Sequence, residues 1–431
     1  MLFSKIKTVD EHWNVLKDRY VETDGTKIRY IGTERPAGYA GEEIRGDGKF
    51  LIPGFYNTHC HVPMTLLRGH GTGLPLDRWL HEAIFPVEAR LTPDDIYYGA
   101  LLGIAELLSS GVVSFSDMYF RIPRYAQALE EAGIKGNLTN GVVAFSPEAT
   151  YHGDRSFEEL VQLDREFADT DGRIVADVGI HSEYASTEPV VREAADYARE
   201  NGKIIQIHVS ETLKEHEECK QRHHGKTPTE YLYDCGVFDS RTVMAHCVHT
   251  EAQDHEIIRE KGAFMSHNIS SNLKLGSGIA PVSNWLKKGL NVTIGTDGPA
   301  SNNNLNYLEE MHLAAMVATG VTRDACAVKA QDIFRMASRT GALAQGREDC
   351  GLMKEGMRAD LIMFDLDKPH LIPDADTLGN ILYSAQSSDI CMTMVDGKIV
   401  YRDGVFPGLD LERITCEVTK RQQRLLKEAG F

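Results

Sequence analysis

The residues of this chain that could do chemistry are histidines and carboxylates that follow runs of apolar residues. His59 and His61 stand two positions apart in the segment PGFYNTHCH. Side chains two apart in a strand point to the same face, so these two imidazoles could bind a single metal ion. The pair alone is weak evidence, because surface loops also carry the pattern by chance.

Three further apolar runs end in a residue of the same kind. His208 closes KIIQIHVS, and Glu211 follows it by three positions. His246 closes TVMAHC, and Asp297 lies in NVTIGTDG. Each has a structural explanation on its own: a buried histidine, a turn aspartate or a glutamate at a helix start. Chance rarely places such groups at four strand ends together, so we predict one shared site.

The segment from residue 53 to residue 345 indicates how these ends are brought together. Short apolar runs such as RIVADVGIH alternate with amphipathic stretches such as TEPVVREAADYARENG, and several of these stretches end in glycine. This alternation predicts a parallel α/β fold, and about eight such units fit a (β/α)8 TIM-like barrel. Barrels of this kind place their active sites at the C-terminal ends of the strands. A doubly wound open sheet is the alternative, weakened because no GxGxxG follows the first strand.

Both ends of the chain read as strands joined by turns. Residues 1–52 contain DGTKIRYIGT, and residues 346–431 contain CMTMVDGKIVYRDGVF, in which DG pairs mark the turns. We predict that the two ends form one small β-sandwich domain. A polar helix, LERITCEVTKRQQRLLKEAG, closes the second segment.

Composition excludes several classes of partner. The net charge of -17 opposes binding to nucleic acid. The apolar stretches are far shorter than the ~20 residues that span a bilayer, so no membrane partner is expected. The eight cysteines form no CxxC pair, which fits a reducing compartment rather than a disulfide scaffold. We therefore expect a cytoplasmic protein with a small-molecule substrate. Whether the protein forms a homo-oligomer stays open, because the sequence carries no interface signal.

The segments that carry the candidate histidines and carboxylates resemble the amidohydrolase superfamily, in its mononuclear deaminase branch. Within that branch the chain is most similar to the methylthioadenosine/S-adenosylhomocysteine deaminases. The matching segments, which cover nearly the whole chain in the family's order, are PGFYNTHCH, HVSE, AHCVH, SHNISSNLKLGSGIAPV, TIGTDG, GMRADLIMFDL and MVDGKIVY. The resemblance implies hydrolysis of the 6-amino group of an adenosine-type nucleoside to the inosine analogue and ammonia. The candidates are 5'-methylthioadenosine, S-adenosylhomocysteine, 5'-deoxyadenosine and adenosine.

The resemblance also implies a metal site. Its ligands are His59, His61, His208 and Asp297, a set that suits Zn²⁺, with Fe²⁺ as the alternative. Binuclear members of the superfamily add a lysine or carboxylate on the fourth strand. That strand ends here at His181, so one divalent ion is expected.

Three catalytic roles follow from the resemblance. Asp297 accepts a proton from the attacking water, and Glu211 protonates the ring nitrogen beside the carbon that is attacked. His246 orients the attacking oxygen and stabilises the tetrahedral intermediate.

Further residues are implied to bind the substrate, as Glu211 also does. Trp79 covers the base or ribose, Glu88 accepts hydrogen bonds from the ribose hydroxyls, and His181 contacts the purine. After His181, this chain departs from the family pattern by carrying an additional carboxylate, Glu183.

A second departure concerns the amino-acid end of S-adenosylhomocysteine. Asn140 stands where the family commonly has an arginine, and Arg155 matches a second family arginine. The loss of one guanidinium weakens a clamp for a carboxylate, so substrates without a carboxylate are expected to be preferred.

Two alternatives remain. A related aminohydrolase acting on guanine, a pterin, cytosine or a chloro-triazine shares the metal ligands but not the ribose carboxylate. A noncatalytic relative is the other, although such proteins usually lose ligands and this chain keeps them all.

Overall fold

The larger part of the molecule is built on parallel strands. The structure is a computed structural model that describes residues 1–76 and 78–431. One sheet has the order β10-β8-β7-β6, with bounds Ile174–Ala176, Lys135–Thr139, Val112–Met118 and Phe55–Cys60. The other has the order β15-β14-β13-β12-β11-β9, with bounds Asn291–Ile294, Phe264–His267, Thr242–His246, Ile205–Val209, Val178–Ile180 and Gly141–Val142. The pairings within both sheets are parallel, which confirms the predicted α/β class.

Two interrupted strands join these sheets. Asn140 separates β8 from β9, and Asp177 separates β10 from β11, while β8 pairs with β10 and β9 with β11. The carboxylate of Asp177 accepts hydrogen bonds from the backbone N–H of Ile204 and from Asn137 Nδ2. The run RIVADVGIH, predicted as one strand, is therefore broken where its aspartate bonds to neighbouring strands.

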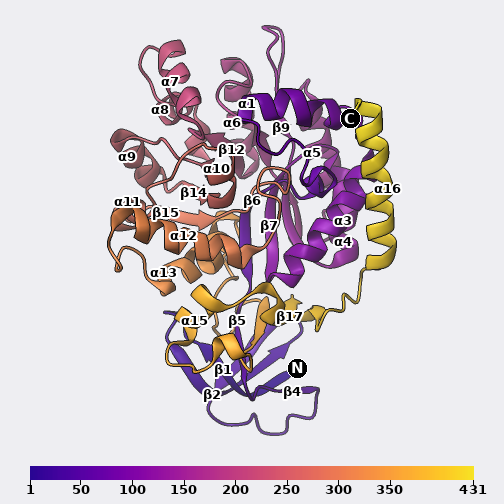
Figure 1. The fold of residues 1–431 in the computed structure, drawn as a ribbon, viewed down its shortest axis with the longest axis vertical. Coiled ribbons are helices and arrows are strands. Elements are labelled where there is room, and N and C mark those ends of the chain that lie inside the picture. The colour runs from indigo at the N-terminus through magenta and orange to yellow at the C-terminus, as the bar shows by residue number, and fades with distance from the viewer.

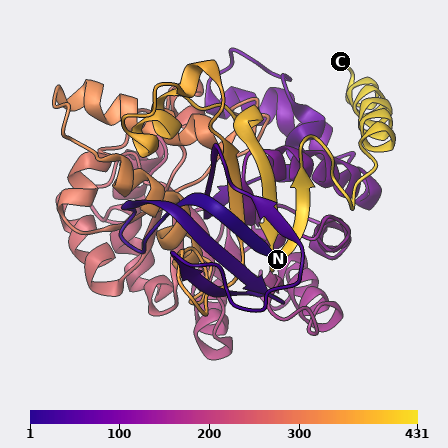
Figure 2. The ribbon, with the colours of Figure 1, turned by 90° about the horizontal axis from the view of Figure 1, so that it is seen from below.

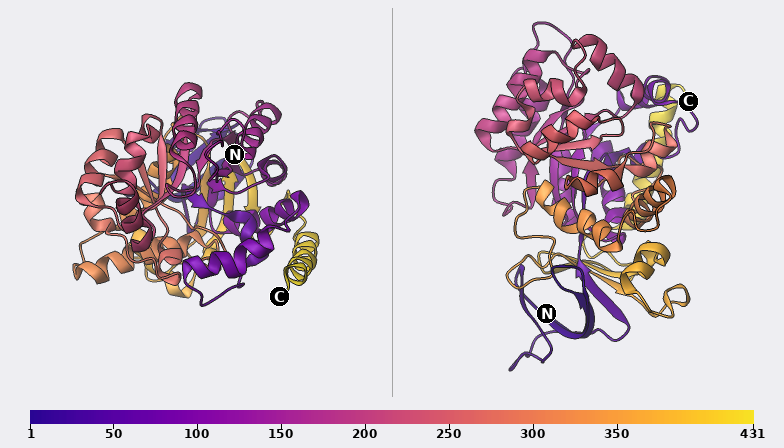
Figure 3. Two further views of the ribbon diagram at one scale, coloured as in Figure 1. Left: turned by 90° about the horizontal axis from the view of Figure 1, so that it is seen from above. Right: turned by 90° about the vertical axis from the view of Figure 1, so that its left-hand side faces the viewer.

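Helices cover the outside of the parallel strands (Figures 1 and 3). They are α3 (Pro93–Ser109), α4 (Ile122–Ala132), α5 (Arg155–Glu166), α6 (Glu188–Asn201), α7 (Leu213–Arg222), α8 (Pro228–Asp234), α9 (Ala252–Lys261), α10 (Ile269–Lys274), α11 (Val282–Lys287), α12 (Tyr307–Thr322), α13 (Ala330–Arg335) and α14 (Gly341–Ala344). With helices on one side and packed side chains on the other, strands such as β7, β12 and β13 are buried along their whole length.

Short helical segments complete the connections. Those after β6 are η1 (Val62–Leu67), α1 (Leu76–Arg78), the π-helical η2 (Trp79–Ile84) and α2 (Phe85–Glu88). The others are η3 (Val237–Asp239), the π-helical η4 (Met336–Thr340), η5 (Pro369–Leu371), α15 (Thr377–Ser384) and η6 (Ser387–Asp389).

The two ends of the chain share one eight-stranded sheet, which lies below the parallel strands in Figure 3 and is seen from below in Figure 2. Its order is β18-β17-β16-β5-β1-β2-β3, with β4 paired to β1. The bounds are β1 (Leu2–Val9), β2 (Val15–Asp24), β3 (Lys27–Gly32), β4 (Glu43–Arg45), β5 (Lys49–Pro53), β16 (Leu361–Asp365), β17 (Ile390–Val395) and β18 (Lys398–Arg402). The antiparallel pair β5–β16 joins the two ends.

The last helix, α16 (Leu411–Ala429), lies against α3 rather than against this sheet (Figure 1). Arg421 and Arg424 of α16 both bind the carboxylate of Asp95, in the first turn of α3, at 2.9 and 2.6 Å. Asp95 is buried and also closes a capping box with Thr92. The eight-stranded sheet has parallel and antiparallel pairs and is called the mixed sheet below. The segment 346–431 therefore contributes both to the mixed sheet and to the helical layer. Among the described residues, no helix combines the length and apolar character needed to cross a bilayer.

A buried ion pair fastens the mixed sheet to the parallel strands. Lys135, the first residue of β8, lies 2.5 Å from Asp360 Oδ2 and 2.8 Å from Asp396 Oδ1. The hydroxyl of Tyr56 donates to the same Oδ2 atom. Burial alone would raise the pKa of Asp360, but the charge and hydrogen bond of Lys135 outweigh it and lower that pKa.

Replacing Lys135 by methionine leaves Asp360 buried without its cation. We expect Lys135→Met to lower the free energy of unfolding by about 3–5 kcal/mol, as for other broken buried pairs. Chemical denaturation followed by circular dichroism measures this loss. The control is Lys354→Met, which removes an exposed lysine paired with Glu11 and is expected to leave stability unchanged. Equal effects of the two variants would show that the buried pair has no special weight.

Candidate metal centre and active site

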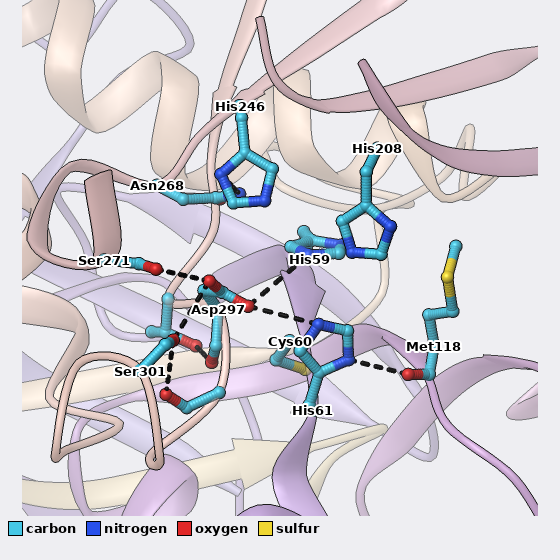
Figure 4. A network of polar contacts seen from close by, with 12 residues as sticks. His59, Cys60, His61, Met118, His208, His246, Asn268, Ser271, Asp297 and Ser301 are labelled. Carbon is cyan, nitrogen blue, oxygen red and sulfur yellow. Dashed lines mark hydrogen bonds and ion pairs between the residues drawn. The ribbon is translucent and has the colours of Figure 1, made fainter. Parts of the chain in front are cut away.

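Four strand ends bring histidines and a carboxylate together in one buried cluster (Figure 4). Its members are His59 and His61 from the end of β6, His208 from β12, His246 from β13 and Asp297, which follows β15. Cys60 lies between the first two, and its thiol instead contacts Asp117 and the carbonyl of Ser116. The alternation expected of a strand therefore directs both imidazoles of the HxH pair to one side.

The ligand atoms of the cluster lie within reach of one ion. His61 Nε2 is 3.1 Å and His59 Nε2 is 3.6 Å from Asp297 Oδ1. Ring nitrogens of His59, His61 and His208 all lie within 4.8 Å of one another, and so do the ligand atoms of His59, His246 and Asp297. These separations are those of side chains that converge on a common point (Figure 4).

Backbone carbonyls fix the tautomers of two imidazoles. His61 Nδ1 donates to the carbonyl of Met118 at 2.6 Å, and His208 Nδ1 donates to the carbonyl of His181 at 2.7 Å. A carbonyl only accepts, so Nδ1 carries a hydrogen in both rings and Nε2 is the atom that can offer a lone pair to a metal ion. The buried Nε2 of His59 has no hydrogen-bond partner. An unsatisfied lone pair beside two oriented imidazoles and a carboxylate fits a divalent metal ion such as zinc.

Burial and neighbouring charges act in opposite directions on the imidazoles of the cluster. Burial lowers the pKa of His59 to about 4 and that of His208 well below its usual value, so both imidazoles are neutral at pH 7. Burial also acts to lower the pKa of His61, but the hydrogen bond and charge of Asp297 raise it to about 9. His59 and His61 in turn overcome the effect of burial and hold the pKa of Asp297 well below its usual value. Metal binding must therefore displace a proton from His61.

Two serines orient the carboxylate of Asp297. Ser271 Oγ donates to Oδ2 at 2.5 Å and Ser301 Oγ donates to the same atom at 3.0 Å, which leaves Oδ1 facing the imidazoles. The backbone N–H of Asp297 donates to the carbonyl of His59, so this residue is tied directly to β6. Sequence reasoning missed both serines. Ser301 stands four residues after Asp297, the one local signal that could have identified it.

Glu211 and His246 lie next to each other at this face. Glu211 Oε2 is 3.8 Å from His246 Nε2, and Ser277 Oγ donates to Glu211 Oε1 at 3.1 Å. His246 Nδ1 donates to Asn272 Oδ1 at 2.8 Å, and Asn268 Nδ2 lies 3.4 Å from the same nitrogen. Asn272 and Asn268 therefore both contact the His246 ring.

The backbone at these strand ends is held in the left-handed region. The φ angles are 49° at Ser210, 71° at His246, 53° at Cys247 and 61° at Asp297. Residues other than glycine adopt such angles at a cost, and they persist where surrounding contacts hold them. Glu215 supplies one such contact, because its carboxylate accepts the backbone N–H groups of Ser210 and Glu211. The turn that presents Glu211 is thereby fixed.

Two predicted substrate residues lie beside the cluster. The ring of His181 is 4.9 Å from that of His208, and burial lowers the pKa of His181 to about 4. Glu88 Oε1 accepts a hydrogen bond of 2.6 Å from the hydroxyl of Tyr119, whose ring is 6.4 Å from that of His61. Burial raises the pKa of Glu88. Tyr119 was not predicted, although it directly follows β7.

Trp79 occupies a different position. It opens the π-helical turn η2, is buried, and packs its indole against Gly71. A Cβ atom at Gly71 would lie 3.0 Å from the indole Cδ1, so the close approach requires glycine there. The contacts of Trp79 thus order the loop after β6.

Asn140 and Arg155 meet at a shared carboxylate. Asn140 Nδ2 donates to Glu159 Oε2 at 3.0 Å, and Arg155 Nε donates to Glu159 Oε1 at 2.8 Å. Glu159 also accepts the backbone N–H of Arg121. The side chain of Arg155 is 60% exposed, and its guanidinium already has an internal carboxylate partner.

Glu183 turns toward α7 rather than toward the imidazoles. Its carboxylate binds Arg222 and lies 3.5 Å from His223 Nε2. The additional carboxylate seen in the sequence is therefore engaged outside the cluster of His59, His61 and Asp297.

Comparison with known proteins places this geometry in a family. The model of the amidohydrolase family matches residues 50–400. A protein of Acetivibrio thermocellus named 5-methylthioadenosine/S-adenosylhomocysteine deaminase is 42% identical over 413 residues, which cover 96% of this chain and 94% of that protein. A 5'-deoxyadenosine deaminase of Methanothermobacter thermautotrophicus is 41% identical over 398 residues, which cover 92% of each chain.

A solved structure agrees over the full length. The adenosine deaminase of Xanthomonas campestris with bound zinc superimposes with a TM-score of 0.93 at 27% identity, covering 99% of this chain and 98% of that one. The family match spans most of the chain and includes every strand end of the cluster. This protein belongs to the amidohydrolase family.

Proposed function

We propose that the protein is a metal-dependent hydrolytic deaminase that converts the 6-amino group of an adenosine-type nucleoside to the inosine analogue and ammonia. The observation that carries the proposal is the convergence of three imidazoles and the Asp297 carboxylate beside Glu211 and His246. Relatives named for deamination of 5-methylthioadenosine, S-adenosylhomocysteine and 5'-deoxyadenosine support this substrate class. The zinc-bound adenosine deaminase of similar fold supports it further.

One divalent ion, zinc or alternatively iron, is assigned to His59, His61, His208 and Asp297. The fixed tautomers and the unsatisfied His59 Nε2 support this set. When bound, such an ion lowers the pKa of a water molecule toward neutrality and so supplies the nucleophile.

Three side chains carry the protons and the geometry of the reaction. Asp297 Oδ2 is held by serines while Oδ1 faces the imidazoles, so Oδ1 is the oxygen that would accept a proton from the attacking water. Glu211, held by Ser277, donates a proton to the ring nitrogen beside the carbon that is attacked. His246, fixed by Asn272, orients the attacking oxygen through Nε2. Protonation of the ring avoids a build-up of negative charge on the purine.

The substrate is positioned by groups next to the cluster. His181 is a neutral imidazole that can hydrogen-bond the purine. Glu88 offers acceptor oxygens for the ribose hydroxyls, and Tyr119 holds its carboxylate in place. Trp79, which is buried against Gly71, is proposed to cover the nucleoside from the loop after β6.

The 5' end of the substrate is expected to lack a carboxylate. Asn140 provides no guanidinium, and Arg155 is paired with Glu159. We therefore assign 5'-methylthioadenosine, 5'-deoxyadenosine or adenosine as better substrates than S-adenosylhomocysteine.

We also propose that the parallel strands close into a (β/α)8 barrel of residues 53–345, with a small β-sandwich domain from residues 1–52 and 346–431. The parallel bridge between Cys60 and Asp297, at the outer edges of the two sheets, supports closure. The antiparallel pairing of β5 with β16 supports a domain made from both ends.

The role of Glu211 is testable with an isosteric variant. We expect Glu211→Gln to lower kcat for ammonia release by about 10²–10⁴-fold, because glutamine cannot shuttle a proton. Metal content measured by elemental analysis should stay at the wild-type level. The matched control is Glu217→Gln, an exposed position on α7, which should keep full activity. Near-normal turnover of Glu211→Gln would remove Glu211 from the mechanism.

Comparing activity on a nucleoside with activity on its free base distinguishes the proposed nucleoside deaminase from the alternative aminohydrolases. We expect Glu88→Ala to lower kcat/KM for adenosine by about 10- to 150-fold, the loss of hydrogen bonds to a charged acceptor, while leaving any rate on free adenine unchanged. The panel should include guanine, cytosine, a pterin and a chloro-triazine. If wild-type protein released ammonia or chloride from one of these faster than from every nucleoside, the alternative aminohydrolase would be correct.

The 5' preference has its own test. We expect kcat/KM for 5'-methylthioadenosine to exceed that for S-adenosylhomocysteine by about 10-fold or more, since a charge-assisted clamp is missing. Glu159→Gln removes the charged partner of Arg155. This variant should therefore have a smaller ratio of kcat/KM for 5'-methylthioadenosine to kcat/KM for S-adenosylhomocysteine. Glu158→Gln, an exposed neighbour on α5, makes the same charge change and should not alter the ratio. A wide preference of wild type for S-adenosylhomocysteine would refute the inference from Asn140.

A further inference from the structure

A second group of metal-ligand side chains lies on the α7 side of the molecule. It consists of Glu183, Cys219 and His223, named here the α7 cluster, whose carboxylate oxygen, thiol sulfur and ring nitrogen all lie within 4.8 Å of one another. Glu183 is 2% exposed and Cys219 is fully buried. Glu183 Oε2 is 3.5 Å from His223 Nε2. The cluster shares no residue with the catalytic metal centre.

Two elements bring these side chains together. Glu183 lies in the loop after β11, three residues beyond Ile180. Cys219 is on α7, and His223 is the residue that caps its C-terminal end. The two are four apart, and the N–H of His223 donates to the carbonyl of Cys219, so the helical turn places both on one face. The ring of His223 stacks on Tyr231 at 3.9 Å, which fixes its orientation.

The carboxylate of Glu183 is only partly satisfied. Oε1 binds Arg222, whereas the buried Oε2 has no hydrogen-bond partner. A buried oxygen without a partner carries an unrecovered desolvation penalty. Burial raises the pKa of Glu183 against the opposing effect of Arg222, and burial together with the Glu183 charge raises the pKa of the Cys219 thiol. Oε2 therefore lacks a hydrogen bond where it lies close to the sulfur and the ring nitrogen.

We propose that the α7 cluster is a second binding site for a divalent ion of the zinc class, with Glu183, Cys219 and His223 as its protein ligands. A set of one oxygen, one sulfur and one nitrogen favours a borderline, thiolate-accepting ion over Mg²⁺ or Ca²⁺, which prefer oxygen ligands. The carboxylate and the thiolate together carry two negative charges toward the ion, and Arg222 stays paired with the other carboxylate oxygen, Oε1. Binding requires loss of the Cys219 proton to solvent, which the free energy of coordination drives.

An ion bound at the α7 cluster would link two segments that present proposed substrate-binding residues. The loop that carries Glu183 begins at His181, and α7 carries Glu215, whose carboxylate accepts the N–H groups of Ser210 and Glu211. An ion at the α7 cluster joins this loop to α7. The site is therefore structural: it holds the segments that present His181 and Glu211, and it takes no part in the proton transfers. This inference does not depend on the proposed substrate.

Cobalt distinguishes the two sites, because only the α7 cluster contains sulfur. Apoprotein titrated with Co²⁺ should bind a second equivalent per chain and develop a thiolate-to-cobalt charge-transfer band in the near ultraviolet. His208→Ala removes a ligand of the catalytic centre only, so this variant should keep the band while it loses one equivalent. Wild-type protein that binds a single equivalent and shows no charge-transfer band would overturn the proposal.

Two variants and a matched control assign the band. Cys219→Ala should abolish it and remove the second equivalent, and His223→Ala should weaken binding at that site by at least tenfold. Cys235→Ala removes another buried thiol from the same region, outside the cluster, and should leave both readouts unchanged. The rise in melting temperature on metal addition should be smaller in Cys219→Ala than in Cys235→Ala. A band that survives Cys219→Ala, or that disappears in Cys235→Ala, would refute the ligand assignment.

Discussion

The buried carboxylate of Asp297 is the group around which the site is organised. Burial opposes its ionised form, yet two imidazoles and two serine hydroxyls stabilise that form. In return, the carboxylate raises the pKa of His61. At His59 the effect of burial is larger, and the pKa is lowered. Its N–H bond to His59 ties the last parallel strand to the first. Without the strand ends meeting at this point, the cluster would be an assembly of unpaired buried groups.

Local periodicity was sufficient to predict the groups that meet there. His59 and His61 could be assigned to one face because strand side chains alternate, and the four strand ends could be grouped because parallel strands end at one edge. Ser271, Asn272 and Ser277 could not be found in this way. They lie on or after a short helix, and their partners are up to 66 residues distant in sequence. The breaks at Asn140 and Asp177 were missed because their side chains bond to distant segments: Asn140 donates to Glu159 on α5, and Asp177 accepts from Asn137 on β8.

Side-chain pairing in the folded chain also determines which contacts single residues make. Glu183 follows His181 in sequence, yet Arg222 turns its carboxylate toward α7. Arg155 matches a family arginine, yet Glu159, one helical turn later, occupies it. The absence of CxxC pairs gave no sign of the α7 cluster, because its thiol and imidazole are four residues apart at the end of α7 and its carboxylate comes from the loop after β11. The sequence identifies residues that could bind a ligand, whereas the contacts they make depend on the folded arrangement.

The shared sheet of the two chain ends has a consequence for biosynthesis. Pro53 pairs with Leu361, so the whole catalytic segment must leave the ribosome before β5 meets β16. Until then the N-terminal strands expose an unpaired edge, the kind of surface that associates with other chains. This connection of high contact order makes late steps of folding depend on the C-terminal region. We therefore expect cellular yield to depend on the last seventy or so residues, which carry none of the proposed catalytic groups.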